Sequence, residues 1–375
     1  MRWDDLRTDG PPSRQPAAGD ALTLFERDAV ARTFDTPEFR GMTFFEVNAR
    51  SVINRVPDAS RLPFRWTINP YRGCSHACSY CFARNTHTYL DFDSGHDFDS
   101  KIVVKVNAPE RLRKELAAPR WRGEHIAMGT NVDCYQRAEG RYRLMPGILA
   151  ALRDYANPFS ILTKGTLILR DLELLSRAAE VTDVSLAVSV GCADRDLWRT
   201  LESGAPSPRA RLEVCSTLAE HGLGCAVLMG PVVPFLSDSP AQLDATVRQV
   251  AQAGARSVTP IVLHLRTGAR EWFFRWLGEQ HPELMPRYLE LYGSRAYAPR
   301  AYQERVAAQV RELAERHGVG RDRPGGRRRA VGMPVRGSRS VPYASPRWRA
   351  PAGRMPPPPG ADSAADPVQL PLLEP

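Results

Sequence analysis

The strongest constraint on the fold is a regular alternation of short apolar runs with helical patterns. The apolar runs cover residues 64–70, 125–130, 159–164, 184–190, 224–230 and 257–263. Helical patterns separate them near residues 109–118, 145–155, 170–180, 208–221 and 239–254. Strands that alternate with helices favour a parallel sheet, and six such repeats predict an incomplete barrel. In such folds functional groups gather at the carboxyl ends of strands, so each polar strand end is a candidate site.

The segments on either side of this core predict the domain organisation. Residues 1–59 form an expected N-terminal extension, disordered in its first part because it is polar and rich in Pro and Gly. Residues 60–317 contain the barrel and, from 269, C-terminal helices; residues 318–375 lack periodicity and are expected to be a disordered Arg- and Pro-rich tail. The predicted fold class is α/β, a partial (β/α)6 TIM-like barrel with these additions.

Three of the seven cysteines, Cys74, Cys78 and Cys81, follow the first predicted strand with the spacing C-x3-C-x2-C. An odd cysteine count and a tight cluster argue for metal ligation rather than disulfides. Iron–sulfur clusters usually take four thiolates, so three would leave one iron open to another ligand. The alternative is zinc, with His76 or His87 as a fourth ligand, but zinc ribbons pair two C-x2-C units and no second unit exists here.

The motif made by these cysteines with Tyr80 resembles the radical S-adenosylmethionine (SAM) superfamily. The resemblance implies a [4Fe–4S] cluster whose open iron binds SAM. It also implies that one electron, from a reductant such as flavodoxin or ferredoxin, cleaves SAM to a 5′-deoxyadenosyl radical that abstracts hydrogen from a substrate. The fold of that family is the partial (β/α)6 barrel predicted above.

Further segments resemble the subgroup that includes spore photoproduct lyase. They are MGTNVDCYQ (128–136), ILTKG (161–165), SLAVSV (185–190), LESGAPSPRARLE (201–213) and GPVVPFLSD (230–238). This resemblance implies a relationship and a lyase-like enzyme, not a shared substrate.

Two strand ends carry candidate cofactor residues. Lys164 can donate to the methionyl carboxylate of SAM as a point charge, and the resemblance assigns the same role to Lys164 and to Ser189. The alternative for Lys164 is a solvated surface position. Gly230 and Pro231 permit close approach of the backbone to the cofactor, and the alternative is a tight turn.

A polar run follows the second strand. Thr130 and Asn131 are candidates for the cofactor, and Asp133 and Gln136 for the substrate, because amides and hydroxyls both donate and accept hydrogen bonds. The alternative is a capped loop. Cys134 lies in the same run, and the lyase resemblance implies a hydrogen-donating thiol there; the alternative is a small buried hydrophobe. Cys192 remains a second candidate, whereas Cys215 and Cys225 fit core positions.

The tail suggests macromolecular partners. Residues 321–350 hold nine arginines and one acid, which gives +8 of the net charge of +9 and could bind DNA phosphates. Near the end, QLPLL resembles the peptide that repair proteins insert into the sliding clamp, with Gln369, Leu370, Leu372 and Leu373 as its contacts. The sequence contains no run of 18 apolar residues and no secretory leader. We therefore expect a cytoplasmic enzyme, without a membrane span and without export.

Nucleic acid is the favoured substrate class, and two alternatives stay open. One is radical SAM chemistry on a small molecule or a protein. The other is a non-catalytic nucleic-acid-binding module stabilised by zinc or a cluster.

Overall fold

The computed structural model describes residues 29–320 apart from residues 59 and 61. Its larger sheet has seven strands in the order β11-β10-β9-β8-β7-β4-β3. Six of them run parallel: β4 (Trp66–Ile68), β7 (Ile126–Met128), β8 (Phe159–Thr163), β9 (Val184–Ser189), β10 (Ala226–Val232) and β11 (Ser257–Val262). β3 (Ile53–Arg55) adds an antiparallel strand beside β4. The two edge strands of this sheet, β11 and β3, do not pair with each other, so the barrel is open and partial. This arrangement confirms the predicted fold class.

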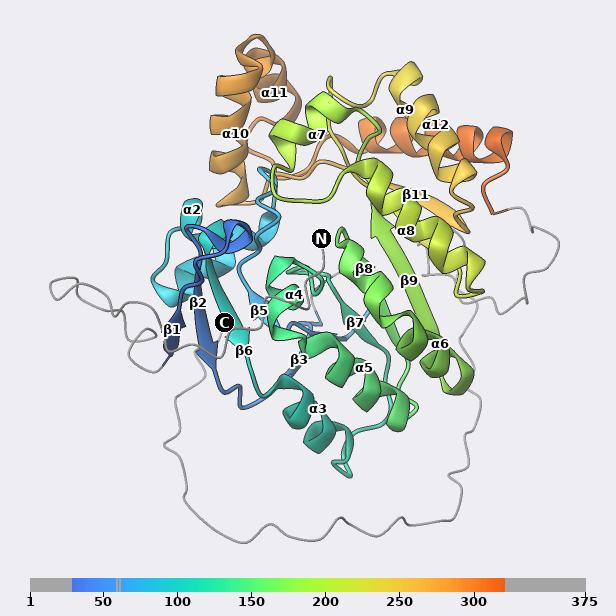
Figure 1. Ribbon diagram of the computed structural model, residues 1–375. Helices are drawn as coiled ribbons and strands as arrows, with labels where there is room; N and C mark the ends of the chain where they lie inside the picture. The colour runs from blue at the N-terminus through green and yellow to red at the C-terminus, as the bar shows by residue number, and fades with distance from the viewer. Residues whose placement is uncertain (1–28, 59, 61, 321–375) are drawn as a thin grey trace, which may run out of the picture. The chain divides into compact units, whose positions relative to one another are not determined.

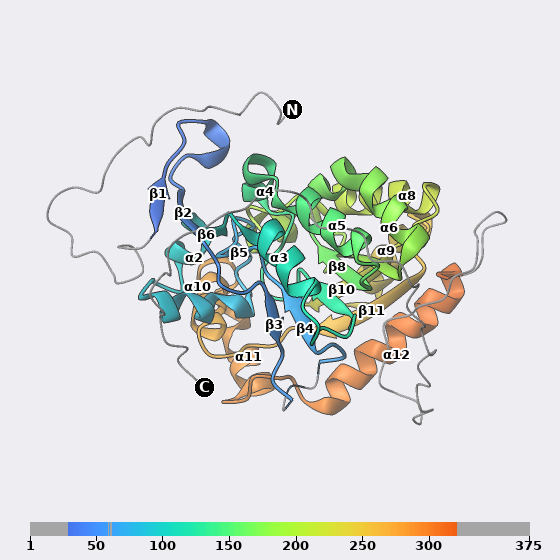
Figure 2. The same cartoon turned by 90° about the horizontal axis from the view of Figure 1, so that it is seen from below.

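Helices cover the outer face of this sheet (Figures 1 and 2). α3 (Ala108–Leu116) comes directly before β7. The helices that follow barrel strands are α4 (Arg137–Tyr142), α5 (Leu144–Asp154), α6 (Leu172–Val181) after the 3-10 turn η4 (Thr166–Asp171), α7 (Arg195–Leu201), α8 (Pro208–Glu220) and α9 (Pro240–Gln252). α8 and α9 begin alike: a serine, Ser207 or Ser239, accepts a hydrogen bond from a backbone amide of the first turn, and proline follows it. These caps fix the two helix starts beside the carboxyl ends of β9 and β10.

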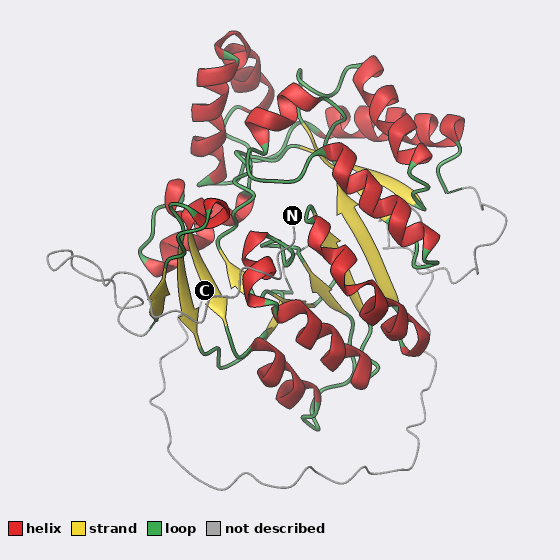
Figure 3. Ribbon diagram, in the orientation of Figure 1, coloured by secondary structure: helices red, strands yellow, loops and turns green. Residues whose placement is uncertain are grey.

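A second sheet of four strands, in the order β1-β2-β6-β5, lies beside the barrel (Figure 3). It consists of β1 (Val30–Arg32), β2 (Thr43–Val47), β5 (Tyr71–Arg72) and β6 (Lys101–Lys105). Three short elements join these strands: η2 (Pro37–Phe39), η3 (Phe82–Leu90) and α2 (His96–Ser100). The sequence did not predict this sheet, because strands of two to five residues are too short to show a period. β5 matters most for the site, since it carries the chain from β4 into the cysteine motif.

The C-terminal helices are α10 (Ala269–Gln280), α11 (Met285–Tyr292), which follows the 3-10 turn η5 (Pro282–Leu284), and α12 (Arg300–His317). Phe273 and Trp276 are buried, and they belong to a second core cluster with Tyr288 and Tyr292. Trp272 lies outside this cluster, and its ring centroid is 4.8 Å from the guanidinium of Arg84 in η3. Among the described helices, none is long and apolar enough to cross a membrane.

Several predictions fall on residues 1–28 and 321–375, outside the described residues. They concern the disordered N-terminal segment, the arginine-rich tail and the clamp-like motif at Gln369, Leu370, Leu372 and Leu373.

Candidate active site

The three cysteines lie on one loop between β5 and η3. The loop begins at Gly73, whose φ of 77° lies in the left-handed region. A Cβ atom there would lie 2.8 Å from the carbonyl oxygen of Lys101 and 2.9 Å from the His87 ring, so only glycine fits. Two turns then fold the loop: the Ala77 amide donates to the Cys74 carbonyl and the Cys81 amide to the Cys78 carbonyl, both at 3.2 Å. The motif is therefore wrapped rather than extended.

All three thiols are free, and their environment fits a cluster-binding role. Cys74 and Cys78 are buried and Cys81 is half-buried. Burial raises the pKa of all three thiols, that of Cys78 to about 12, and the negative charge of Cys81 adds to the rise at both Cys74 and Cys78. Neighbouring buried thiols become stable as thiolates when a metal centre compensates their charge.

The zinc alternative finds no ligand set in the described part of the chain. No group of three or more His, Cys, Asp or Glu side chains there is placed to hold a single metal ion. A cluster makes a different demand, because each thiolate binds a different iron atom and the sulfurs need not meet at one point.

Two residues predicted to contact substrate, Asp133 and Gln136, make hydrogen bonds within the protein. Gln136 is fully buried; its amide donates to the Gly73 carbonyl (2.8 Å) and accepts from the Ser75 amide (3.0 Å). Asp133 accepts from the Thr163 hydroxyl and the Lys164 amide, both at 2.7 Å. Asp133 also accepts from the Tyr135 amide, which closes the loop after β7, whereas the Gln136 side chain makes no helix-capping hydrogen bond. A substrate role for either residue stays a prediction.

His76 completes the contact between the loop and Asp133. Its Nδ1 lies 3.4 Å from Asp133 Oδ2, and burial lowers its pKa to about 4. The ring is therefore neutral near pH 7 and suited to donate from Nδ1 to the carboxylate. His76 thus has a structural contact within the protein, between the cysteine loop and the end of β7.

Three predicted cofactor residues meet at the ends of β8, β9 and β10. Lys164 Nζ donates to Ser189 Oγ (2.9 Å), and Ser189 Oγ donates to the Gly230 carbonyl (3.0 Å). The Gly230–Pro231 peptide bond is cis. Thr130 and Asn131 follow β7, are half-buried, and make no side-chain hydrogen bond within the described residues. Their polar atoms are available to a ligand.

Sequence reasoning missed the buried carboxylate that organises this region, Glu202. It accepts hydrogen bonds from the Tyr80 hydroxyl and from Arg211, and its Oε1 lies 3.9 Å from Lys164 Nζ. Burial acts to raise its pKa, but the charges of Arg211 and Lys164 outweigh burial and lower it. Its backbone also bridges to Cys78. The only sequence signal was that Glu202 and Arg211 share the lyase-like segment 201–213.

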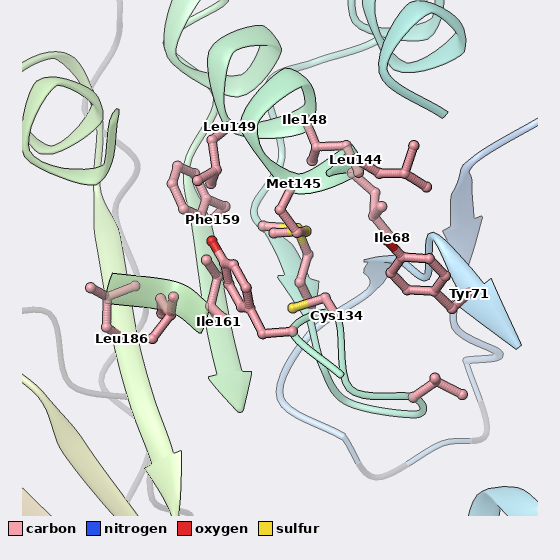
Figure 4. Packing of buried hydrophobic residues seen from close by; sticks show 14 of the residues in the cluster. Ile68, Tyr71, Cys134, Leu144, Met145, Ile148, Leu149, Phe159, Ile161 and Leu186 are labelled. Carbon is pink, nitrogen blue, oxygen red and sulfur yellow. The ribbon is translucent and has the colours of Figure 1, made fainter. Parts of the chain in front are cut away.

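Cys134 does not face the site. Its thiol is 0% exposed and packs in the main hydrophobic core with Met145 and Ile161 (Figure 4). Burial raises its pKa well above the ordinary value. This position agrees with the alternative of a small buried hydrophobe and gives no support to hydrogen donation. Cys192 is also buried, in the second core cluster.

A cavity of about 760 Å³ borders the cysteine loop at His76. Among its lining residues are His76, Gly165, Trp198 and Ser207. Its lining includes Gly165, which adjoins Lys164, but none of the three motif cysteines, Lys164 or Ser189.

Comparisons with known proteins agree with this geometry. Residues 68–246 match the family model described as the radical SAM superfamily. The chain is 49% identical over 322 residues to uncharacterized protein Rv2578c of Mycobacterium tuberculosis, covering 86% of this chain and 94% of that protein. It is 28% identical over 195 residues to uncharacterized protein MJ0683 of Methanocaldococcus jannaschii, covering 52% and 69% of the two chains.

The chain belongs to the radical SAM superfamily. It is a radical SAM enzyme, and membership implies an iron–sulfur cluster and SAM as its cofactors. Spore photoproduct lyase complexed with dinucleoside spore photoproduct shares its fold, with a TM-score of 0.54, 15% identity, and coverage of 74% of this chain and 80% of that chain. A lyase variant with bound AdoMet and dinucleoside spore photoproduct gives a TM-score of 0.55 at 14% identity. At these identities the likeness concerns the fold alone.

Proposed function

We propose that this radical SAM enzyme binds a [4Fe–4S] cluster on Cys74, Cys78 and Cys81 and acts on a nucleic-acid substrate. When bound and reduced, such a cluster supplies the electron that cleaves SAM to methionine and a 5′-deoxyadenosyl radical, which abstracts hydrogen from the substrate. The observation that carries the proposal is the position of the Lys164–Ser189–Gly230 chain beside the cysteine loop: Lys164 Nζ lies 5.8 Å from the ring of Tyr80, between Cys78 and Cys81.

Different residues of this chain would bind different parts of SAM. Lys164 carries a positive charge for the methionyl carboxylate, and Ser189 fixes the direction of its ammonium group. Glu202 does not neutralise that charge fully, because Arg211 already pairs with it at closer range. Thr130 and Asn131 offer donors and acceptors for the polar parts of the cofactor.

The nucleic-acid part rests on the lyase-like fold. Spore photoproduct lyase, which shares that fold, is described with a dinucleoside ligand. The arginine-rich tail adds a sequence argument, since a basic segment binds phosphates without sequence preference. A flavodoxin or ferredoxin as reductant and the sliding clamp as a partner of the tail remain parts of this proposal.

Deuterium transfer tests the chemistry and the substrate class together. The full-length protein is reconstituted with iron and sulfide under anaerobic conditions, reduced with dithionite, and given SAM with a single-stranded oligonucleotide deuterated in its sugars and thymine methyl groups. We expect 5′-deoxyadenosine to form and to carry deuterium. Absence of 5′-deoxyadenosine would contradict radical SAM chemistry. Its formation without deuterium from any oligonucleotide would instead favour a small-molecule or protein substrate.

A further inference from the structure

An aromatic surface lies directly beside the third cysteine of the motif. Phe82 follows Cys81, and its ring centroid is 5.8 Å from that of His264, two residues beyond the end of β11. The His264 ring in turn stacks on Tyr297 at 5.6 Å with an interplanar angle of 23°. A backbone bridge between His264 and Tyr297 holds the two rings in register. Three chain segments distant in sequence thus present one row of rings, called here the stacking surface.

The stacking surface carries a positive charge without an acidic partner. The Arg266 guanidinium lies 5.8 Å from the Phe82 ring and 6.0 Å from the Tyr297 ring. It donates to the Tyr297 hydroxyl at 2.8 Å and forms no ion pair within the described residues. Its charge is therefore available to an anionic group that meets the rings.

Much of this surface is open. Phe82 is 36% exposed and Tyr297 is 48% exposed, although both are large aromatic side chains. Burial and the charge of Arg266 lower the pKa of His264, so its ring is neutral near pH 7 and adds no second charge. Exposed aromatic side chains that cluster, rather than occur singly, mark interaction sites.

The position of the stacking surface connects it to the cofactor residues. β11 is the edge strand of the barrel, and its Ile261, 38% exposed, faces β10: the Cβ position of Gly230 lies 3.6 Å from Ile261 Cβ. Gly230 accepts the hydrogen bond from Ser189, which holds Lys164. His264 of the stacking surface follows Ile261 by three residues, just beyond the end of β11 at the open edge of the barrel.

We propose that Phe82, His264 and Tyr297 stack a nucleobase of a single-stranded substrate while Arg266 meets the adjacent phosphate. The inference rests on the proposed nucleic-acid function and adds the residues that would recognise it. Rings receive any base, since every base has a flat π-face, and the unpaired guanidinium suits a phosphate oxygen. Stacking of one base on one ring is typically worth about 1–3 kcal/mol, which corresponds to about five- to 150-fold in affinity.

The test measures binding of a fluorescein-labelled single-stranded DNA 12-mer by anisotropy, using the reconstituted full-length protein at fixed salt. We expect Tyr297→Ala and Arg266→Gln each to weaken binding at least fivefold. Tyr297→Phe keeps the ring and should lie within about twofold of wild type. Tyr155→Ala is the matched control, because Tyr155 is 44% exposed but lies at the end of α5 next to the start of β8, at the opposite end of the barrel strands.

A second measurement separates substrate stacking from binding of the adenine of SAM. SAM affinity and iron content are measured for each variant without DNA, and we expect both to match wild type. A loss of SAM affinity in Tyr297→Ala as large as its loss of DNA affinity would assign the rings to the cofactor and overturn the inference. Equal DNA binding by wild type and Tyr297→Ala would overturn it too, and leave the proposed function standing. No DNA binding by the wild type, with 5′-deoxyadenosine still formed, would overturn both the inference and the nucleic-acid substrate.

Discussion

The ammonium group of Lys164 lies 2.9 Å from the hydroxyl of Ser189, so a hydroxyl rather than a carboxylate is its nearest partner. The closest acid, Glu202, is 3.9 Å away and is paired with Arg211. A lysine tied to a carboxylate would have its charge compensated within the protein. Lys164 keeps much of its charge for a ligand, and its direction is set by two successive strand ends.

Replacing this lysine should weaken SAM binding without loss of the cluster. A charge-assisted hydrogen bond is worth about 1.5–3 kcal/mol, so Lys164→Ala should lower SAM affinity roughly ten- to a hundredfold. Equilibrium dialysis against the reconstituted protein measures this, with iron content determined in parallel. Lys114→Ala, at an exposed position of α3, is the control and should change neither quantity. Unchanged affinity in Lys164→Ala would make Lys164 a structural residue of the strand end.

The cysteine motif predicts an all-or-none loss. Cys74→Ala, Cys78→Ala and Cys81→Ala should each lose most iron and all formation of 5′-deoxyadenosine, because two thiolates do not anchor a cluster firmly. Cys215→Ala should retain iron, since Cys215 is a core side chain on α8. Iron and sulfide analysis after anaerobic reconstitution compares the four variants. Full iron and activity in any motif variant would refute the assignment of that ligand.

Gly204 lies close to the cysteine loop, so a substitution there should affect the cluster although Gly204 is not a ligand. Its amide donates to the His76 carbonyl at 3.1 Å, and a Cβ atom would lie 2.1 Å from the Ser75 carbonyl oxygen. Gly204→Ala must therefore displace the loop, and we expect lower iron loading together with a Tm lower by several degrees.

Gly278→Ala is the matched control for this substitution. Gly278 is exposed within α10, with no atom within 4 Å of its Cβ position, so alanine there should stabilise the helix by about 0.5–1 kcal/mol. If Gly204→Ala has the iron content and Tm of the wild type, the cysteine loop can move aside without loss of stability or cluster binding, and the prediction is wrong.

Long elements of the barrel were predictable because burial on both faces leaves continuous apolar runs, as in β9 and β10. The cysteine motif was recognisable because its ligands are local in sequence. The four-stranded sheet was not predictable, since β5 has only two residues and pairs with β6 across about thirty positions. Its order depends on tertiary contacts that no local pattern encodes.

Roles at the site were harder to assign than positions. Asp133 and Gln136 were correctly placed after a strand, but polarity alone does not separate a ligand contact from a loop clamp. Glu202 was not predicted, because an acidic residue in a helical segment usually faces solvent. In the structure it is buried together with Arg211, nine residues later, with which it forms an ion pair. Whether the Cys134 thiol points toward the site or into the hydrophobic core depends on the backbone conformation of a single turn, which the sequence does not show.

The last prediction concerns Lys105, a half-buried cation in the second sheet whose charge Glu115 offsets only in part. Burial, with the nearby charge of Arg72, lowers its pKa from 10.5 to about 8, and no ion pair or hydrogen bond to its side chain occurs within the described residues. Below pH 8 the ammonium is charged in the folded and the unfolded state, so partial burial of this charge lowers the stability of the folded protein. Between pH 8 and 10.5 the folded state releases the proton first, and the destabilisation decreases as pH rises.

Lys105→Met should therefore raise Tm at pH 7 by about 2–4 °C, corresponding to about 1 kcal/mol, and by clearly less at pH 10. Lys114→Met should show no such pH dependence, because Lys114 is exposed. Differential scanning fluorimetry of both variants at the two pH values measures the effect, and an equal or larger gain at pH 10 would mean that the methionine stabilises by packing rather than by removing a buried charge.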